Sequence, residues 1–137
     1  MRILFLLVFT IPFISFSQNR LSIEVLGVPN SDGNIMVALY NTSDSFLKSD
    51  RVYKADSVHA TEGITEVEIS DIPDGEYAVA IFHDANGNDE LDTNWLGIPK
   101  EDVGFSKAKM KTFGPPKFSE CSFKMESDKN KSVRVEL

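Results

Sequence analysis

The stretch YAVAIFHDANGNDELD, residues 77–92, decides the fold, because an apolar run passes directly into a polar turn. The first six residues are apolar, and the run from Ile35 to Tyr40 is apolar at nearly every position. Short runs of this kind indicate central strands that are covered on both sides. The residues Asn86-Gly87-Asn88 that follow are typical of a chain reversal. This stretch therefore predicts a buried strand that ends in a tight polar loop.

Period-two alternation indicates that most of the remaining chain forms half-buried strands, as at Val133, Val135 and Leu137. We expect about seven strands, near residues 20–26, 34–40, 56–60, 64–70, 76–83, 118–125 and 131–137. Short strands without a long helical period predict an all-β fold, an antiparallel two-sheet sandwich. The one place for a short helix is residues 43–55, where Ser43 or Ser45 could cap it and Phe46 and Leu47 could face the core.

The N-terminus has the anatomy of a secretory signal peptide, residues 1–17. Arg2 precedes an apolar run, and Ser15-Phe16-Ser17 supplies small residues for cleavage. The run is shorter than the roughly 20 residues that cross a bilayer as a helix. We therefore expect an exported protein, periplasmic or extracellular, with no membrane span after cleavage; an uncleaved membrane anchor is the alternative. The mature residues 18–137 have a usual length for a single domain.

Charge and cysteine content narrow the classes of partner and chemistry. After cleavage the chain would carry 13 basic and 21 acidic residues, a formal charge of −8. Such a surface repels phosphate backbones, so we expect no nucleic-acid partner. Cys121 is the one cysteine and cannot form an internal disulfide. Its alternation with Phe123 and Met125 indicates a buried small hydrophobe rather than a reactive thiol.

The loop HDANGNDELD, residues 83–92, holds the one constellation with a chemical interpretation. With Asp84 as position one, oxygen-bearing side chains occupy positions one, three, five and nine, and a backbone carbonyl is available at position seven. The candidate ligands are therefore Asp84, Asn86, Asn88, Glu90 through its carbonyl, and Asp92. Ca²⁺ takes six to eight such oxygens, so the spacing predicts a calcium site in the weak class of about 10⁻⁴–10⁻³ M.

Two positions depart from the usual helix–loop–helix calcium loop. Asp89 stands where glycine is usual at position six, and Trp95 stands where a bidentate glutamate is usual at position twelve. The missing carboxylate must come from Glu101 or Asp102, or be replaced by water. The competing interpretation is a solvated turn whose Asx side chains only satisfy backbone N–H groups.

His83 could serve as a metal ligand or general base, which gives the hypothesis of a metal-dependent enzyme centred on His83, Asp84 and Glu101. No nucleophile motif accompanies it, so a structural histidine that bonds the loop is favoured. The segment from Asn94 to Pro116 is longer than most loops in compact domains, and such loops are usually functional or disordered. Its Trp95 either belongs to a binding surface or plugs the end of the sandwich.

Residues 74–118 also follow the pattern GxYAxAxxHDxNxNxxxDxNxxGxPxExxGFS and then GPPxF. In this the chain resembles a secreted bacterial family catalogued as domain of unknown function 2141. The resemblance implies export and an immunoglobulin-like or transthyretin-like sandwich, and the family has no assigned activity. The loop is similar to the DxNxNxxxD calcium loops of repeat domains in bacterial surface adhesins. Transthyretin-like hydrolases share the architecture, but their catalytic histidine set and C-terminal Tyr-Arg-Gly-Ser have no equivalent here.

These observations predict an exported, non-enzymatic binding or accessory domain with Ca²⁺ in the loop at residues 84–92. In this hypothesis the cation orders the loop and so positions residues 94–116 toward an unknown protein or glycan partner outside the cytoplasm. The alternatives are the metal-dependent enzyme and a purely structural module whose loop binds nothing.

Overall fold

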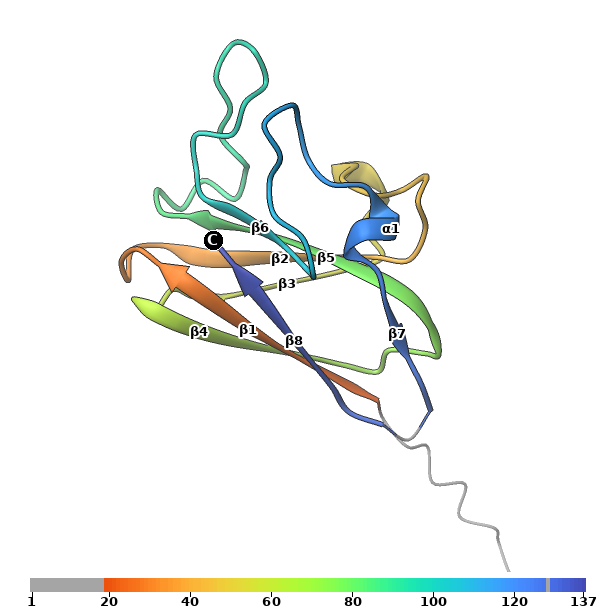
Figure 1. The fold of residues 1–137 in the computed structure, drawn as a ribbon. Helices are drawn as coiled ribbons and strands as arrows, with labels where there is room; N and C mark the ends of the chain where they lie inside the picture. The colour runs from red at the N-terminus through yellow and green to blue at the C-terminus, as the bar shows by residue number, and fades with distance from the viewer. Residues whose placement is uncertain (1–18, 128) are drawn as a thin grey trace, which may run out of the picture.

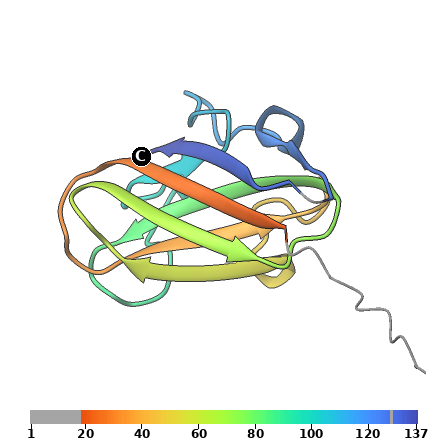
Figure 2. The ribbon, with the colours of Figure 1, turned by 90° about the horizontal axis from the view of Figure 1, so that it is seen from below.

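The computed structural model describes residues 19–127 and 129–137, and within them two β-sheets face each other (Figures 1 and 2). The smaller sheet has the order β4-β1-β8; the larger has the order β3-β2-β5-β6, and β7 also pairs with β5. The strands are β1 Arg20–Val28, β2 Asn34–Tyr40, β3 Lys54–His59, β4 Gly63–Ser70, β5 Gly75–Asp84, β6 Val103–Phe105, β7 Phe123–Met125 and β8 Lys131–Glu136. The predicted all-β sandwich is confirmed. The predicted signal peptide lies outside the described residues, within which no helix is long and apolar enough to span a membrane.

One pairing departs from the predicted antiparallel arrangement. β1 runs antiparallel to β4 but parallel to β8, in the register Leu21↔Lys131 to Leu26↔Glu136. β8 follows β7, which belongs to the opposite sheet, so the chain reaches β1 by crossing between the sheets. A crossover permits parallel pairing, whereas a tight hairpin would impose the antiparallel direction.

Inward-facing residues of both sheets form the main core, as the alternation predicts. β1 contributes Leu21, Ile23 and Val25, all without solvent exposure. A second cluster covers the outer face of β5, where Ala78 packs with Phe105 and Cys121, and half-buried Phe46 and Phe118 lie against them. β5 is therefore covered on both sides, as its uninterrupted apolar run indicates.

Three local predictions were wrong. The described residues contain eight strands rather than about seven, because β6 lies within residues 94–116, and residues 118–125 divide into helix α1 (Phe118–Cys121) and β7. Cys121 is therefore helical, although it is buried as expected. In place of the expected helix, residues 43–55 contain the 3₁₀ turn η1 (Ser49–Arg51) and the start of β3 at Lys54. Leu47 adopts a φ of 62°, which a right-handed helix excludes, and its side chain is exposed rather than in the core.

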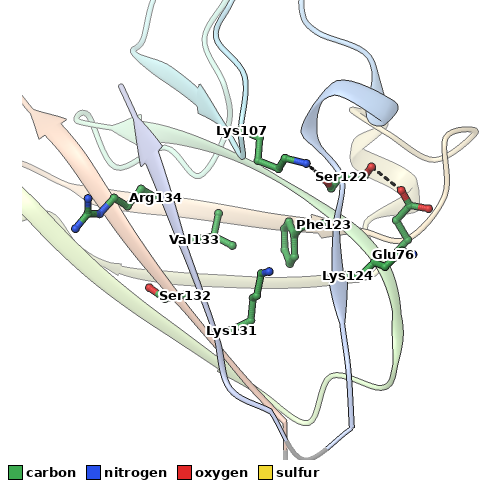
Figure 3. Close-up of a pocket in the computed structure, with 9 residues that line it drawn as sticks. All are labelled: Glu76, Lys107, Ser122, Phe123, Lys124, Lys131, Ser132, Val133 and Arg134. Atoms are coloured by element: carbon green, nitrogen blue, oxygen red, sulfur yellow. Dashed lines mark hydrogen bonds between the residues drawn. The ribbon is translucent and has the colours of Figure 1, made fainter.

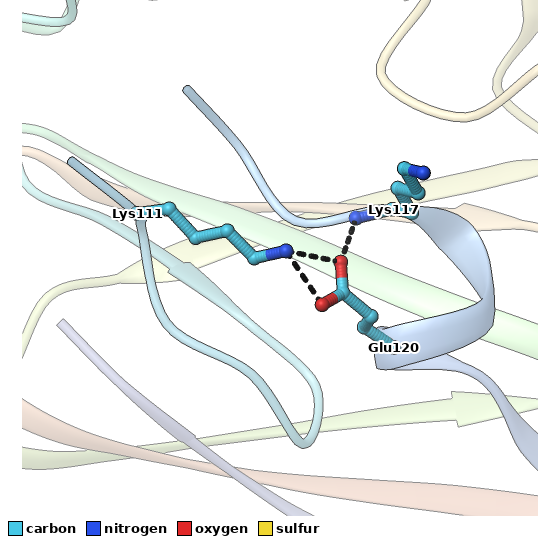
Figure 4. A network of polar contacts seen from close by, with 3 residues as sticks. All are labelled: Lys111, Lys117 and Glu120. Carbon is cyan, nitrogen blue, oxygen red and sulfur yellow. Dashed lines mark hydrogen bonds and ion pairs between the residues drawn. The ribbon is translucent and has the colours of Figure 1, made fainter. Parts of the chain in front are cut away.

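The segment after β6 is fixed to the sheet by polar contacts that the sequence did not reveal. Buried Ser106 donates from Oγ to the Cys121 carbonyl at 2.7 Å, and accepts the Val79 N–H at 2.9 Å. Further along, Lys111 Nζ donates to both carboxylate oxygens of Glu120 at 2.6 and 2.7 Å (Figure 4). This hydrogen bond from Lys111 is the main reason that the pKa of Glu120 is lowered from its ordinary value. The long segment is thereby anchored to α1.

Candidate functional site

The candidate loop begins where β5 leaves the sheet, beside the turn that precedes β2. Asp84 pairs with Asn34 at the last position of the β2–β5 ladder. Gly33 lies so close to this position that an added Cβ would stand 1.9 Å from the Asp84 carbonyl oxygen. Its φ of 62° also favours glycine. The start of the loop is therefore held by close backbone packing.

Asp84 is the structural anchor of the loop. Its side chain has no solvent exposure. Oδ1 accepts the N–H groups of Gly87 at 2.9 Å and Asn88 at 3.2 Å, and Oδ2 accepts the Asp89 N–H at 2.9 Å. Three N–H donors directed at one carboxylate compensate for its burial, because hydrogen bonds to a charged acceptor are strong. The carboxylate thus curls the loop around itself.

Two Asx turns and one strained residue complete the curl. Asn86 Oδ1 accepts the Asn88 N–H at 3.1 Å, and Asn88 Oδ1 accepts the Glu90 N–H at 3.0 Å. Asp89 has a φ of 62°, the left-handed conformation for which glycine is usual at position six of calcium loops. Asp tolerates this conformation better than most residues. The substitution at position six therefore does not prevent the sharp turn.

Asp92 closes the loop from the far side. Its Oδ2 accepts a hydrogen bond from Asn86 Nδ2 at 2.6 Å, and its Oδ1 accepts one from Asn88 Nδ2 at 3.1 Å. Hydrogen bonds thus link all five predicted ligand residues, four of them through their side chains and exposed Glu90 through its backbone N–H. Among the residues that the structure describes, however, no three His, Cys, Asp or Glu side chains lie close enough to hold a metal ion. The Asp92 carboxylate is bonded to side-chain amides, and the Asp84 carboxylate is bonded to backbone N–H groups.

Glu101 is the neighbouring carboxylate that reaches this loop. Its Oε2 accepts the Asp92 N–H at 3.2 Å. Its Oε1 is buried and has no hydrogen-bond partner within the described part of the chain. Asp102, the other candidate, has an exposed side chain, and its carbonyl accepts the His83 N–H at 3.0 Å. The structure therefore brings Glu101, and not the Asp102 side chain, to the loop.

Residues 92–100 form a small hairpin that projects beyond the five-stranded sheet (Figure 1). The Lys100 N–H donates to the Asp92 carbonyl at 2.8 Å, and the Asn94 N–H donates to the Ile98 carbonyl at 2.9 Å. Asn94 Oδ1 accepts two further N–H groups at the tip. Trp95 at this tip is 90% exposed, so the interpretation that it plugs the sandwich is wrong. The hairpin closes on its own backbone and carries Trp95 away from the core.

His83 has a structural position rather than a place beside the loop oxygens. It is 2% exposed, and its Nε2 lies 2.7 Å from the Asp32 carbonyl oxygen in the turn before β2. The expected hydrogen bond to the loop is therefore replaced by one to the opposite turn. The arrangement does not direct Nε2 toward Asp84 or Glu101, and this limits what the three residues could do as a catalytic group.

Comparison with known proteins gives a family but no activity. No curated protein and no solved structure matches the chain. Residues 23–134 match the family model described as an uncharacterized protein conserved in bacteria, DUF2141. The match covers every strand that supports the candidate loop, together with the loop itself. The chain therefore belongs to this uncharacterized bacterial family.

Proposed function

We propose that this chain is an exported, non-enzymatic binding module in which calcium is held by the loop at residues 84–92 together with Glu101. The observation that carries the proposal is the buried Oε1 of Glu101, which has no hydrogen-bond partner among the described residues and lies beside a loop with oxygen side chains at alternate positions. A buried carboxylate oxygen without a partner is costly, and a cation would compensate for it.

The donor set suits a hard cation. The loop offers carboxylates from Asp84 and Asp92, amide oxygens from Asn86 and Asn88, and the Glu90 carbonyl, and Glu101 adds a third carboxylate. Each Asn oxygen accepts one N–H group and keeps a second lone pair. All-oxygen sets of this kind are preferred by Ca²⁺ over transition metals.

The hydrogen bonds of Asp92 also fit weak binding. Asp92 is hydrogen-bonded to two amide nitrogens, and these bonds must be given up when the carboxylate turns to a cation. That cost places the site in the class of extracellular modules, with a Kd of about 10⁻⁴–10⁻³ M. Such an affinity is useful where calcium is abundant, which agrees with the proposed location outside the cytoplasm.

Calcium at this position would stabilise the projecting hairpin. Asp92 and Glu101 flank the base of the hairpin, and the Asp92 N–H already donates to Glu101. Holding both carboxylates on one ion would fix the direction of the tip that carries Trp95, Leu96 and Ile98, all exposed. Exposed aromatic and aliphatic groups on a rigid support are suited to a protein or glycan partner. We therefore assign the exposed part of residues 94–116, with the hairpin tip, to partner contact; β6 within this segment is held in the sheet.

Calorimetric titration with Ca²⁺ and thermal melting with and without chelator test the proposal. A ligand at 10 mM with a Kd of 10⁻⁴–10⁻³ M stabilises the folded state by about 1.4–2.7 kcal/mol. For a chain of this size that corresponds to an increase in Tm of roughly 5–10 °C. The absence of both binding heat and a Tm shift at 10 mM Ca²⁺ would refute the calcium site.

Two matched variants separate the site from general charge effects. Glu101→Gln removes the completing carboxylate and should weaken Ca²⁺ binding at least tenfold. Glu90→Gln removes an equal charge from the loop itself but leaves the carbonyl ligand, and should leave the Kd within about twofold, since exposed charges interact weakly. Equal effects of the two substitutions would contradict a direct role for Glu101.

The non-enzymatic assignment is supported by the position of His83. An enzyme built on His83 would take a transition metal through the imidazole. We expect the purified protein to hold no stoichiometric transition metal, and His83→Gln, which keeps a hydrogen-bonding group, to leave the Ca²⁺ affinity nearly unchanged. Stoichiometric zinc or iron that disappears in His83→Gln would overturn this assignment.

A further inference from the structure

We propose that the open side of the sandwich, between β7 and β8, is a docking groove for an extended acidic peptide segment of a partner protein. In this proposal the segment adds to the sheet as a strand along the free edge of β8. The groove is separate from the calcium loop and does not depend on it.

The first observation is that both strands beside the groove are edge strands. β8 is the last strand of the three-stranded sheet and pairs only with β1 among the described strands. β7 pairs with β5 over three residues and belongs to the other sheet. An edge strand presents unpaired N–H and C=O groups at alternate positions, which are a template for another strand. Figure 3 shows the two strands on either side of the opening.

The second observation is that the opening has a defined length. Near the end of β8, β6 packs against it so closely that a Cβ on Gly104 would lie 2.7 Å from the Glu136 carbonyl oxygen. This contact closes the sandwich there. Beside residues 131–134 the sheets diverge and leave a groove of about 540 Å³. Four residues of strand span about 10 Å, so the edge accommodates a short extended segment and not a folded domain.

The third observation is charge. Lys107, Lys124, Lys131 and Arg134 line the groove, and Glu76 is the one acid among the lining residues. Positive charge is thus concentrated on a chain whose net charge is −7. Such a groove attracts an acidic segment and rejects a basic one, since electrostatic complementarity sets specificity.

The four basic side chains of the groove differ in whether they already have a hydrogen-bond or ion-pair partner. Lys107 Nζ donates to the Ser122 carbonyl at 2.8 Å, and Arg134 pairs with Glu24 at 3.5 Å. Lys124 and Lys131 have neither an ion pair nor a side-chain hydrogen bond within the described part of the chain. These two cations are therefore free to pair with carboxylates of a docked segment.

The floor of the groove supplies the apolar component. Phe123 from β7 and Val133 from β8 are buried, and they lie in the space between the two strands (Figure 3). Side chains of an added strand alternate in direction, so one set would contact this floor beside Lys131, which lies on the same face of β8 as Val133, while the other set would lie on the opposite face, where β8 carries Arg134. The groove therefore suits a segment that carries both apolar and acidic residues.

The test measures binding of a synthetic, end-capped eight-residue peptide that alternates glutamate and valine. Fluorescence anisotropy gives its Kd, and amide hydrogen exchange gives the site of contact. We expect a Kd below 1 mM and slower exchange at residues 131–134. The double variant Lys124→Glu/Lys131→Glu should weaken binding at least tenfold, whereas the equally charged control Lys48→Glu/Lys100→Glu, at exposed lysines outside the groove, should weaken it less than threefold.

Two further probes distinguish strand addition from attraction by charge alone. A peptide methylated on alternate backbone nitrogens cannot form the full ladder and should bind at least tenfold more weakly; equal binding would overturn strand addition. Equally tight binding of inorganic polyphosphate would show a general anion surface instead. A concentration-dependent dimer that protects residues 131–134 would identify a second copy as the occupant. If no peptide binds at 1 mM, the lysines only guard the edge against aggregation and the proposal fails.

Discussion

Replacing Asp84 by asparagine tests how the candidate loop is held before any ion is considered. The side chain keeps its shape, but it has one acceptor oxygen instead of two. In the better of its two orientations, the asparagine side-chain oxygen still accepts the N–H groups of Gly87 and Asn88. The side-chain NH₂ group then faces the Asp89 N–H, which is also a donor. The Asp89 N–H group thereby loses its acceptor, and two charge-assisted hydrogen bonds become neutral ones.

The magnitude follows from these three bonds. The lost bond to a charged acceptor is worth about 1.5–3 kcal/mol, and each weakened bond about 0.5 kcal/mol. Neutralising a buried carboxylate also removes a desolvation cost, which lowers the total. We expect the free energy of unfolding to fall by about 2–4 kcal/mol. With a urea m-value of about 1.5 kcal/mol/M, the unfolding midpoint falls by about 1.3–2.7 M.

Urea denaturation in the presence of chelator measures this effect without a contribution from calcium. Asp89→Asn is the matched control, because Asp89 is exposed in the same loop and asparagine tolerates its positive φ. The control should move the free energy of unfolding by less than about 0.5 kcal/mol. Identical midpoints for wild type and Asp84→Asn would refute the conclusion that the carboxylate organises the loop, and would favour a solvated turn.

Three further outcomes follow from buried and paired groups. Burial raises the pKa of the Cys121 thiol to about 11, so a thiol reagent at pH 8 should label the folded protein at least about 100-fold more slowly than the urea-unfolded chain. Ser106→Ala leaves the buried Val79 N–H without its side-chain acceptor and should cost about 1–3 kcal/mol in urea denaturation. In Lys111→Met the pKa of Glu120, read by NMR titration, should rise toward its ordinary value. The interaction that lowers the pKa of Glu120 stabilises the folded protein at pH values above the ordinary pKa, and this stabilisation is lost as the pH falls through the lowered pKa. The difference in the free energy of unfolding between wild type and Lys111→Met should therefore become smaller in acid.

The sandwich could be predicted because burial imposes a period on the sequence. The alternation in β1 and the uninterrupted run in β5 each identified a strand and the number of faces it buries. β6 escaped prediction because three residues are too few to show a period. The strand expected at residues 118–125 was partly wrong because Cys121 continues the alternation of Phe123 and Met125 across the end of a helix. A helical turn of four residues leaves no distinct pattern of its own.

The candidate site could be predicted only as far as it is local. The alternate oxygen positions from Asp84 to Asp92 are neighbours in sequence, and the structure brings their side chains together through hydrogen bonds. The choice between Glu101 and Asp102 depends on the hairpin that returns the chain to the loop, which no spacing rule specifies. The exposure of Trp95 depends on the same hairpin. The groove lies between β7 and β8, which belong to different sheets. No single segment of the sequence therefore contains the lining residues in a recognisable spacing.

The candidate loop and the groove lie toward opposite ends of β5, and this separation decides whether they act on each other. β7 pairs with β5 as far as Tyr77, and the loop begins at Asp84. Seven residues of strand separate these points by about 23 Å, nearly three Debye lengths of about 8 Å at physiological ionic strength. The charge of a bound cation is therefore largely screened from Lys124 and Lys131. Any dependence of peptide affinity on calcium would have to pass through the backbone of β5, whose central position and double coverage resist displacement.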